Sequence, residues 1–149
     1  MPDMPLSNFD TDDLRCLAGM IIPASTRHGV PGADDKMIFA DILFTLGGDR
    51  DVIREAIAQA RAASSGPLNR LNADAREALA YQLQAENSPQ MAVLTRSLLL
   101  CYYRDDRVLL SLGLEPRAPF PKGYTVEQGD WSLLDPVKLR LPFWRSVDR

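Results

Sequence analysis

The sequence predicts an all-α protein: a small bundle of about five to six helices followed by a long, irregular C-terminal arm rich in proline and aromatic residues. Between residues 10 and 112, apolar residues recur at the spacing of three to four that is typical of amphipathic helices. No segment alternates convincingly with a period of two, and prolines interrupt every candidate helix after residue 113. We therefore expect a helical body over residues 1–113 and an arm over residues 114–149 that packs on the body, on a partner subunit or on both.

The first two expected helices are separated by a loop of turn-forming residues. Asp10 and Thr11 are suitable N-cap residues for the first helix, which Pro23 ends. The second helix is expected from about Asp34 to the glycine pair at 47–48. Because apolar residues cover most of its circumference, we expect this helix to be central and largely buried.

Four further helices complete the expected body. The third begins near Asp49, the fourth has Asn72 as its N-cap, and the fifth opens with Ser88 as the N-cap and Pro89 at its first position. One face of the fifth helix is formed by Met91, Leu94, Leu98 and Cys101, and is broadened by Leu99, Tyr102 and Tyr103. The sixth is short and ends at Gly113. Acidic pairs at 12–13, 34–35 and 105–106 stand at expected helix starts, where carboxylates satisfy free N–H groups and favour the helix dipole.

Composition narrows the possible functions. The 149 residues correspond to about one domain, and the formal net charge of −3 argues against a protein that binds nucleic acid by neutralising phosphates. No run of 18 apolar residues exists that would indicate a membrane span. With two cysteines, one histidine and no CxxC motif, the chain has few residues for metal binding or acid–base catalysis. These counts favour a soluble domain that is not an enzyme by itself.

The candidate catalytic chemistry is weak. His28 lies in a loop near Ser25 and the acidic pair at 34–35, but neighbours in sequence rarely form a catalytic triad, and a solvated loop histidine is the better interpretation. The sequence has no GxSxG, GxGxxG or GxxxxGK[ST] motif. We accordingly predict no catalytic, cofactor-binding or metal-binding residue in this chain. Cys16 and Cys101 are expected to be buried thiols, with a bridge between them as the alternative if their helices touch.

The arm carries the main candidate for a functional surface. It holds five of the eleven aromatic residues, including both tryptophans, whereas disordered segments are usually poor in aromatic residues. Such residues either pack back on the body or anchor an interface, where aromatic and arginine side chains dominate binding. The predicted partner interface consists of Tyr102, Tyr103, Phe120, Tyr124, Trp131, Pro136, Arg140, Phe143, Trp144 and Arg145.

Three stretches of the chain together resemble the gluconate 2-dehydrogenase subunit 3 family. The first is the helix ending in Ile-Ile-Pro-Ala at 21–24, followed by Pro31-Gly32 and the helix ADDKMIFADIL. The second is CYYRDDRVLLSLG at 101–113. The third is PFPKGY at 119–124, followed by LLDPVKLRLPFWR at 133–145. The order and spacing of these stretches carry the resemblance, which runs from about Leu14 to Arg145.

The resemblance implies a function through a partner. Members of this family are small non-catalytic subunits of dehydrogenase complexes, and their partner is a large glucose–methanol–choline (GMC)-type flavoprotein that binds FAD and oxidises a sugar, sugar acid or alcohol. Some complexes add a multihaem cytochrome c subunit. We therefore expect this chain to bind and stabilise such a subunit, to hold no cofactor itself, and to leave FAD to the partner. The alternative is a free-standing helical adaptor or regulatory protein.

The resemblance also bears on location. Exported members of the family carry a twin-arginine leader, whereas residues 1–10 contain neither a basic region nor an apolar stretch. As written, the sequence predicts a cytoplasmic protein, or a periplasmic one if a twin-arginine leader has been removed.

Overall fold

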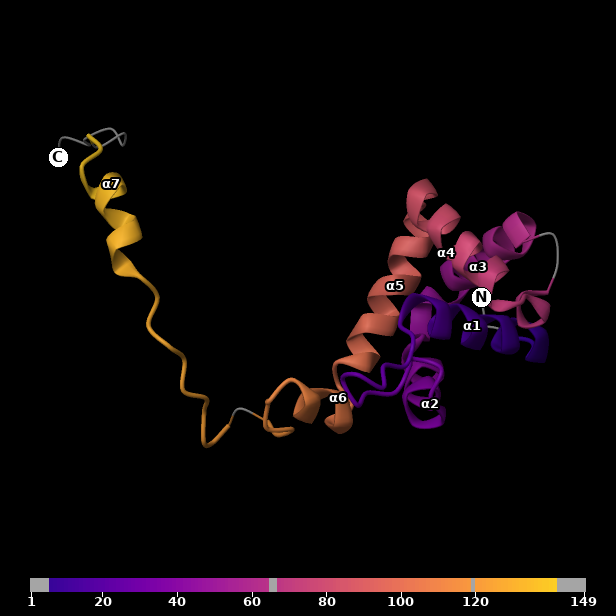
Figure 1. Cartoon of the computed structure of the whole chain (residues 1–149), viewed down its shortest axis with the longest axis horizontal. Coiled ribbons are helices and arrows are strands. Elements are labelled where there is room, and N and C mark those ends of the chain that lie inside the picture. Colours follow the sequence, from indigo (N-terminus) through magenta and orange to yellow (C-terminus); the bar gives the residue numbers. More distant parts are fainter. Residues whose placement is uncertain (1–5, 65–66, 119, 142–149) are drawn as a thin grey trace. The chain divides into compact units, whose positions relative to one another are not determined.

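The computed structural model describes residues 6–64, 67–118 and 120–141. Over these residues the backbone forms α-helices, short 3₁₀ turns and no strand, so the prediction of an all-α protein is confirmed (Figure 1). The chain divides into two units, Met1–Pro116 and Arg117–Arg149. The α-helices of the first unit are α1 (Asn8–Ile21), α2 (Lys36–Thr45), α3 (Arg50–Ser64), α4 (Ala73–Glu86), α5 (Pro89–Tyr102) and α6 (Asp106–Ser111), and that of the second is α7 (Asp135–Lys138).

Five helices of the first unit, α1, α2, α4, α5 and α6, begin after a residue whose side chain caps them. Asn72 accepts a hydrogen bond from the backbone N–H of Ala75 at 2.9 Å, and Ser88 accepts one from Met91 at 3.2 Å, as predicted for α4 and α5. The predicted cap of α1 is wrong, because the helix begins at Asn8, two residues before Asp10. Ser7 is the cap, and it forms a reciprocal capping box with Asp10.

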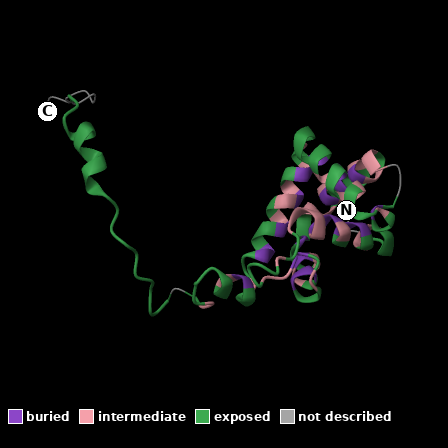
Figure 2. Ribbon diagram, viewed as in Figure 1, coloured by how far each residue is buried: buried purple, intermediate pink, exposed green. Residues whose placement is uncertain are grey.

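The core is centred on α3 and α5 rather than on α2. Ile53 and Ile57 from α3 and Leu94 and Leu98 from α5 are fully buried, and Figure 2 shows buried residues along the inner sides of these helices. The expectation that α2 is central is wrong, because its side chains point both inward and outward. Phe44 is 88% exposed, whereas Ile42 is fully buried. The core therefore buries only part of the apolar surface of α2.

A buried carboxylate joins three elements of the first unit. Asp13 in α1 is only 3% exposed. Its side chain accepts hydrogen bonds from the Arg61 guanidinium in α3 and, at 3.1 Å, from the backbone N–H of Leu68 in the 3₁₀ turn Leu68–Arg70. Arg61 also binds Asp10 at 2.8 Å. Asp13 therefore connects α1 to α3 and to the 3₁₀ turn through tertiary hydrogen bonds. This corrects the sequence-based expectation that its carboxylate serves the start of a helix.

A second ion-pair cluster connects the starts of α2 and α6. Asp35 caps α2 and Asp105 caps α6, as their positions in the acidic pairs predicted. Arg107 lies between them, with its guanidinium 2.7 Å from Asp35 and 2.8 Å from Asp105. The hydrogen bonds from Arg107 lower the pKa of Asp35 to about 2, despite the opposing effect of burial.

The loop between α1 and α2 is folded tightly onto the body. Ser25 and Val30 exchange backbone hydrogen bonds, and the hydroxyl of Tyr102 donates to the carbonyl of Pro31 at 3.1 Å. A Cβ atom added at Gly32 would lie 2.4 Å from a carboxylate oxygen of Asp34 and 2.9 Å from the backbone nitrogen of Ala24. The backbone approaches its neighbours so closely here that only glycine fits at this position.

We predict that Asp13→Ala destabilises the protein by about 3 kcal/mol, because the backbone N–H of Leu68 and the Arg61 guanidinium lose a buried acceptor. Asp12→Ala is the matched control, since Asp12 is the exposed neighbour on the same helix. Chemical unfolding in urea measures both free energies of unfolding. Equal losses in the two variants would contradict the structural role of Asp13.

We predict that Arg107→Met lowers stability at pH 7 by about 1 kcal/mol, because both partners are partly exposed and solvent screens the pair. The pKa of Asp35 is lower in the folded protein, about 2, than in the unfolded chain, so its contribution is present above pH 4 and is lost as the pH falls towards 2. The variant should therefore lose less stability over this interval than the parent protein.

Arg27→Met is the matched control for this measurement, because it removes the same charge from an exposed loop residue. Urea unfolding at pH 7, 4, 3 and 2 (or about those values) gives the slope of stability with pH for each protein. An unchanged slope in Arg107→Met would show that Arg107 does not set the pKa of Asp35.

Candidate functional site

The aromatic residues of the arm that the structure describes are exposed. Phe120 is 87% exposed, Trp131 64% and Tyr124 49%, and Pro136 and Arg140 are exposed as well (Figure 2). The other three predicted interface residues of the arm, Phe143, Trp144 and Arg145, lie outside the described residues. Taken by itself, the described part of the arm thus presents large apolar side chains at its surface.

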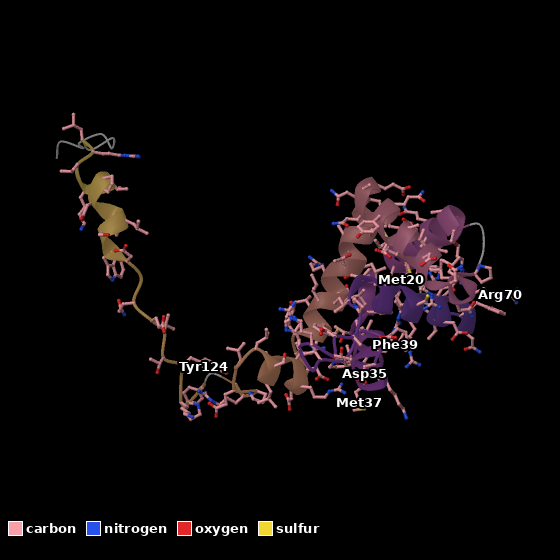
Figure 3. All side chains as sticks on the ribbon, viewed as in Figure 1. Met20, Asp35, Met37, Phe39, Arg70 and Tyr124 are labelled. Carbon is pink, nitrogen blue, oxygen red and sulfur yellow. The ribbon has the colours of Figure 1, made fainter. Side chains whose placement is uncertain are left out.

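The arm folds back on itself where Arg117 meets Gly123 and Tyr124. The guanidinium carbon of Arg117 lies 4.3 Å from the ring centroid of Tyr124, which is labelled in Figure 3. The guanidinium also donates to the carbonyl of Gly123, and the Tyr124 hydroxyl donates to the carbonyl of Arg117. These contacts hold the two ends of the loop together and leave Phe120 exposed between them.

A second part of the arm is helical, which the sequence did not predict. Asp130 accepts a hydrogen bond from the backbone N–H of Ser132 at 3.0 Å and caps the 3₁₀ turn Trp131–Leu134, which leads directly into α7. The Trp131 indole N–H donates to Gln128 at 3.2 Å. Pro136 stands within the first turn of α7, where a proline costs no hydrogen bond. We expected prolines to prevent helices in the arm, but this one is compatible with a helix start.

The two tyrosines that end α5 have different environments. Tyr102 is only 6% exposed and its hydroxyl is bonded to the α1–α2 loop, so it has little surface to offer a partner. Tyr103 is 52% exposed and meets the Tyr102 ring edge-on at 5.4 Å. Of these two predicted interface residues, only Tyr103 is placed to contact another protein.

Tyr103 belongs to an apolar groove between α1, α4 and α5, with a volume of about 990 Å³. We call this the α5 groove. Its floor includes buried Leu17, and its rim includes Leu100, which is 61% exposed. Met20, labelled in Figure 3, contributes from α1. The residues that line the α5 groove are Leu17, Met20, Ile21, Ala80, Leu83, Gln84, Asn87, Met91, Ala92, Thr95, Arg96, Leu99, Leu100 and Tyr103.

Sequence reasoning missed this groove, although a signal for it was present. We assigned Leu99 and Tyr103 to the same face as Leu94 and Leu98, as residues that broaden it, and gave no role to Leu100. In a helix, successive residues are 100° apart, so the run Leu98–Leu99–Leu100 spans about 200°, wider than a single core face. Leu98 is fully buried, while Leu99 and Leu100 are 39% and 61% exposed on the groove side. The excess width of the apolar stripe predicts a second surface.

The candidate catalytic groups are not assembled into a site among the described residues. His28 is exposed, and its recorded contact with Ser25 runs from the backbone N–H rather than from the imidazole. Within the described ranges no group of three or more His, Cys, Asp or Glu residues could hold a metal ion. No helix in the described part of the chain is long and apolar enough to cross a membrane.

The two cysteines are free and do not form a bridge with each other. The Cys16 thiol is half-buried and donates to the carbonyl of Leu68 at 3.3 Å, while Cys101 is buried at the end of α5 beside Arg104. Burial raises the pKa of both thiols, which disfavours the reactive thiolate. These environments fit structural cysteines.

Comparison with known proteins adds no relative: no family model, no curated protein and no solved structure matches this chain.

Proposed function

We propose that this protein is a non-catalytic small subunit that binds and stabilises a large FAD-dependent dehydrogenase of the GMC type. The partner would oxidise CH–OH groups of sugars, sugar acids or alcohols. The resemblance of three stretches to the gluconate 2-dehydrogenase subunit 3 family suggests this partner. In this proposal FAD belongs to the partner, since the sequence of the small subunit has no GxGxxG motif for a dinucleotide.

The exposed apolar surface of the arm is the observation that carries the proposal. Trp131, Phe120 and Leu139 are 64%, 87% and 85% exposed. Burying one such side chain in an interface contributes about 2 kcal/mol, and large aromatic residues are the usual anchors of interfaces. A partner that covers several of them would gain enough to offset the ordering of a long segment.

The local structure of the arm supports the same role. The contacts of Arg117 with Tyr124 fix the loop that presents Phe120. The cap by Asp130 and the indole contact with Gln128 fix the orientation of Trp131. Side chains that are already held in place lose little conformational entropy when they bind.

We predict that Trp131→Ala weakens the complex with the flavoprotein at least about tenfold, because the variant loses a central apolar anchor. The tagged chain is co-expressed with the product of the neighbouring reading frame, which the proposal expects to be the GMC-type flavoprotein. Absorbance near 450 nm, which reports bound flavin, is measured per purified tagged chain. Affinity is then measured by titrating the two purified proteins against each other.

Phe44→Ala is the matched control, because Phe44 is an aromatic residue on α2, outside the arm, and is 88% exposed. It should co-purify with as much flavin as the parent chain. A colourless parent chain without an associated flavoprotein would refute the proposed function and favour a free-standing adaptor. A yellow complex that Trp131→Ala leaves unchanged would instead show that the subunit binds through another surface.

A further inference from the structure

The α5 groove has the dimensions of a binding site for a helix. Its lining residues on α5 run from Met91 to Tyr103, and twelve helical steps correspond to about 18 Å. The members Ala92, Arg96, Leu99 and Tyr103 recur at intervals of four and three, so they form one continuous stripe along the helix. Residues from α1 and α4 contribute to the same groove, which gives it walls as well as a floor.

The exposure of the groove favours a protein helix over a small molecule. Small ligands usually have most of their surface buried in their pockets. Here the side chains of Leu99, Leu100 and Tyr103 are 39%, 61% and 52% exposed, so the groove is open along one side. An amphipathic helix fits such a groove, because it buries one apolar face and keeps the opposite face in water.

Charge at the groove indicates what the occupant carries. Arg96 is the one charged residue among those that line the groove, and it stands near the middle of the α5 stripe. Its side chain is 69% exposed and forms a long, solvent-screened ion pair with Asp49, whose carboxylate oxygen lies 3.9 Å from the guanidinium, farther than a hydrogen bond. The guanidinium can therefore form a direct, forked hydrogen bond with a carboxylate of an incoming helix.

The position of Arg96 also argues against a second copy of this chain as the occupant. In a two-fold symmetric contact through α5, the same patch on each copy meets the other. Because Arg96 lies close to the centre of the stripe, the two guanidinium groups would meet near the symmetry axis and repel each other.

We infer that the α5 groove binds an amphipathic helix of another protein, one that presents apolar side chains at i, i+3, i+4 and i+7 and an acidic residue beside their centre. The apolar side chains cover Leu99, Leu100 and Tyr103, and the acidic residue pairs with Arg96. All the residues that line this surface belong to the helical body, so the inference stands whether or not the arm binds a flavoprotein.

The test uses the full chain and designed, fluorescently labelled peptides of about 14 residues, stapled so that they are helical in water. One peptide has leucines at i, i+3, i+4 and i+7 and a central glutamate beside the stripe. The second has lysine in place of the glutamate, and the third has the leucines scrambled. Fluorescence polarisation gives the affinity of each peptide for the parent chain and for Leu100→Glu, Arg96→Glu and the control Phe44→Glu.

We expect the parent chain and Phe44→Glu to bind the glutamate peptide with micromolar affinity and the scrambled peptide not measurably at about 100 μM. Leu100→Glu should weaken binding of the glutamate peptide at least about tenfold, because a carboxylate then lies in the apolar stripe. Arg96→Glu should weaken the glutamate peptide and restore the lysine peptide, a reversal that only a direct charge pair produces.

Circular dichroism and thermal unfolding confirm that each variant is folded, which is expected because Leu100, Arg96 and Phe44 are largely exposed. Absence of peptide binding up to about 100 μM would overturn the inference. Equal binding by the parent chain and Leu100→Glu would overturn it as well, since the peptide would then bind elsewhere. Sensitivity to Leu100→Glu without the charge reversal at Arg96 would refute the acidic helix as the occupant. Self-association lost in Leu100→Glu would identify a second copy as the occupant instead.

Discussion

The buried carboxylate of Asp13 is the interaction on which the arrangement of the body most depends. It joins α1 to α3 through Arg61 and to the 3₁₀ turn Leu68–Arg70 through the backbone of Leu68. A buried charge is costly unless it is both paired and hydrogen-bonded, so the three groups are held in one geometry. That geometry fixes α1, whose C-terminal half then supplies Leu17 and Met20 to the α5 groove.

Helix α5 has two apolar faces with different roles. One face packs against α3 and α2 and contains the buried residues Leu94 and Leu98. The other face contains Leu99, Leu100 and Tyr103, which the rest of the body leaves partly uncovered. This exposed apolar face is the observation from which we inferred that the α5 groove binds a helix.

The local signals in the sequence were sufficient for most of the body but not for its tertiary arrangement. The caps at Asn72 and Ser88 and the core face of the fifth helix depend on short-range chemistry, and the structure confirms them. Asp13 was assigned to a helix start because its partner Arg61 lies 48 residues away, a distance that no local pattern reveals. The same limit explains the error on α2. Its apolar residues predicted that the helix is buried on all sides, but burial depends on how many neighbouring elements cover it.

For the candidate surfaces, the sequence identified the residue types but not their environments. It singled out Tyr102 and Tyr103 together. In the structure Tyr102 is buried and its hydroxyl donates a hydrogen bond to Pro31, whereas Tyr103 is half exposed at the groove. It placed Trp131 in an arm without helices, because Pro136 was taken as a helix breaker rather than as a residue of the first turn of α7.

The core of the body and the two residues whose substitution tests the proposed binding, Leu100 and Arg96, are different side chains. The body is held together by α3 and α5 packing and by the Asp13 cluster, and both are complete without the exposed side of α5. Surface residues outside a core or a buried network contribute little to stability. The exposed residues Leu100 and Arg96 can therefore be changed without unfolding the chain, so a loss of binding in such variants reports on recognition itself.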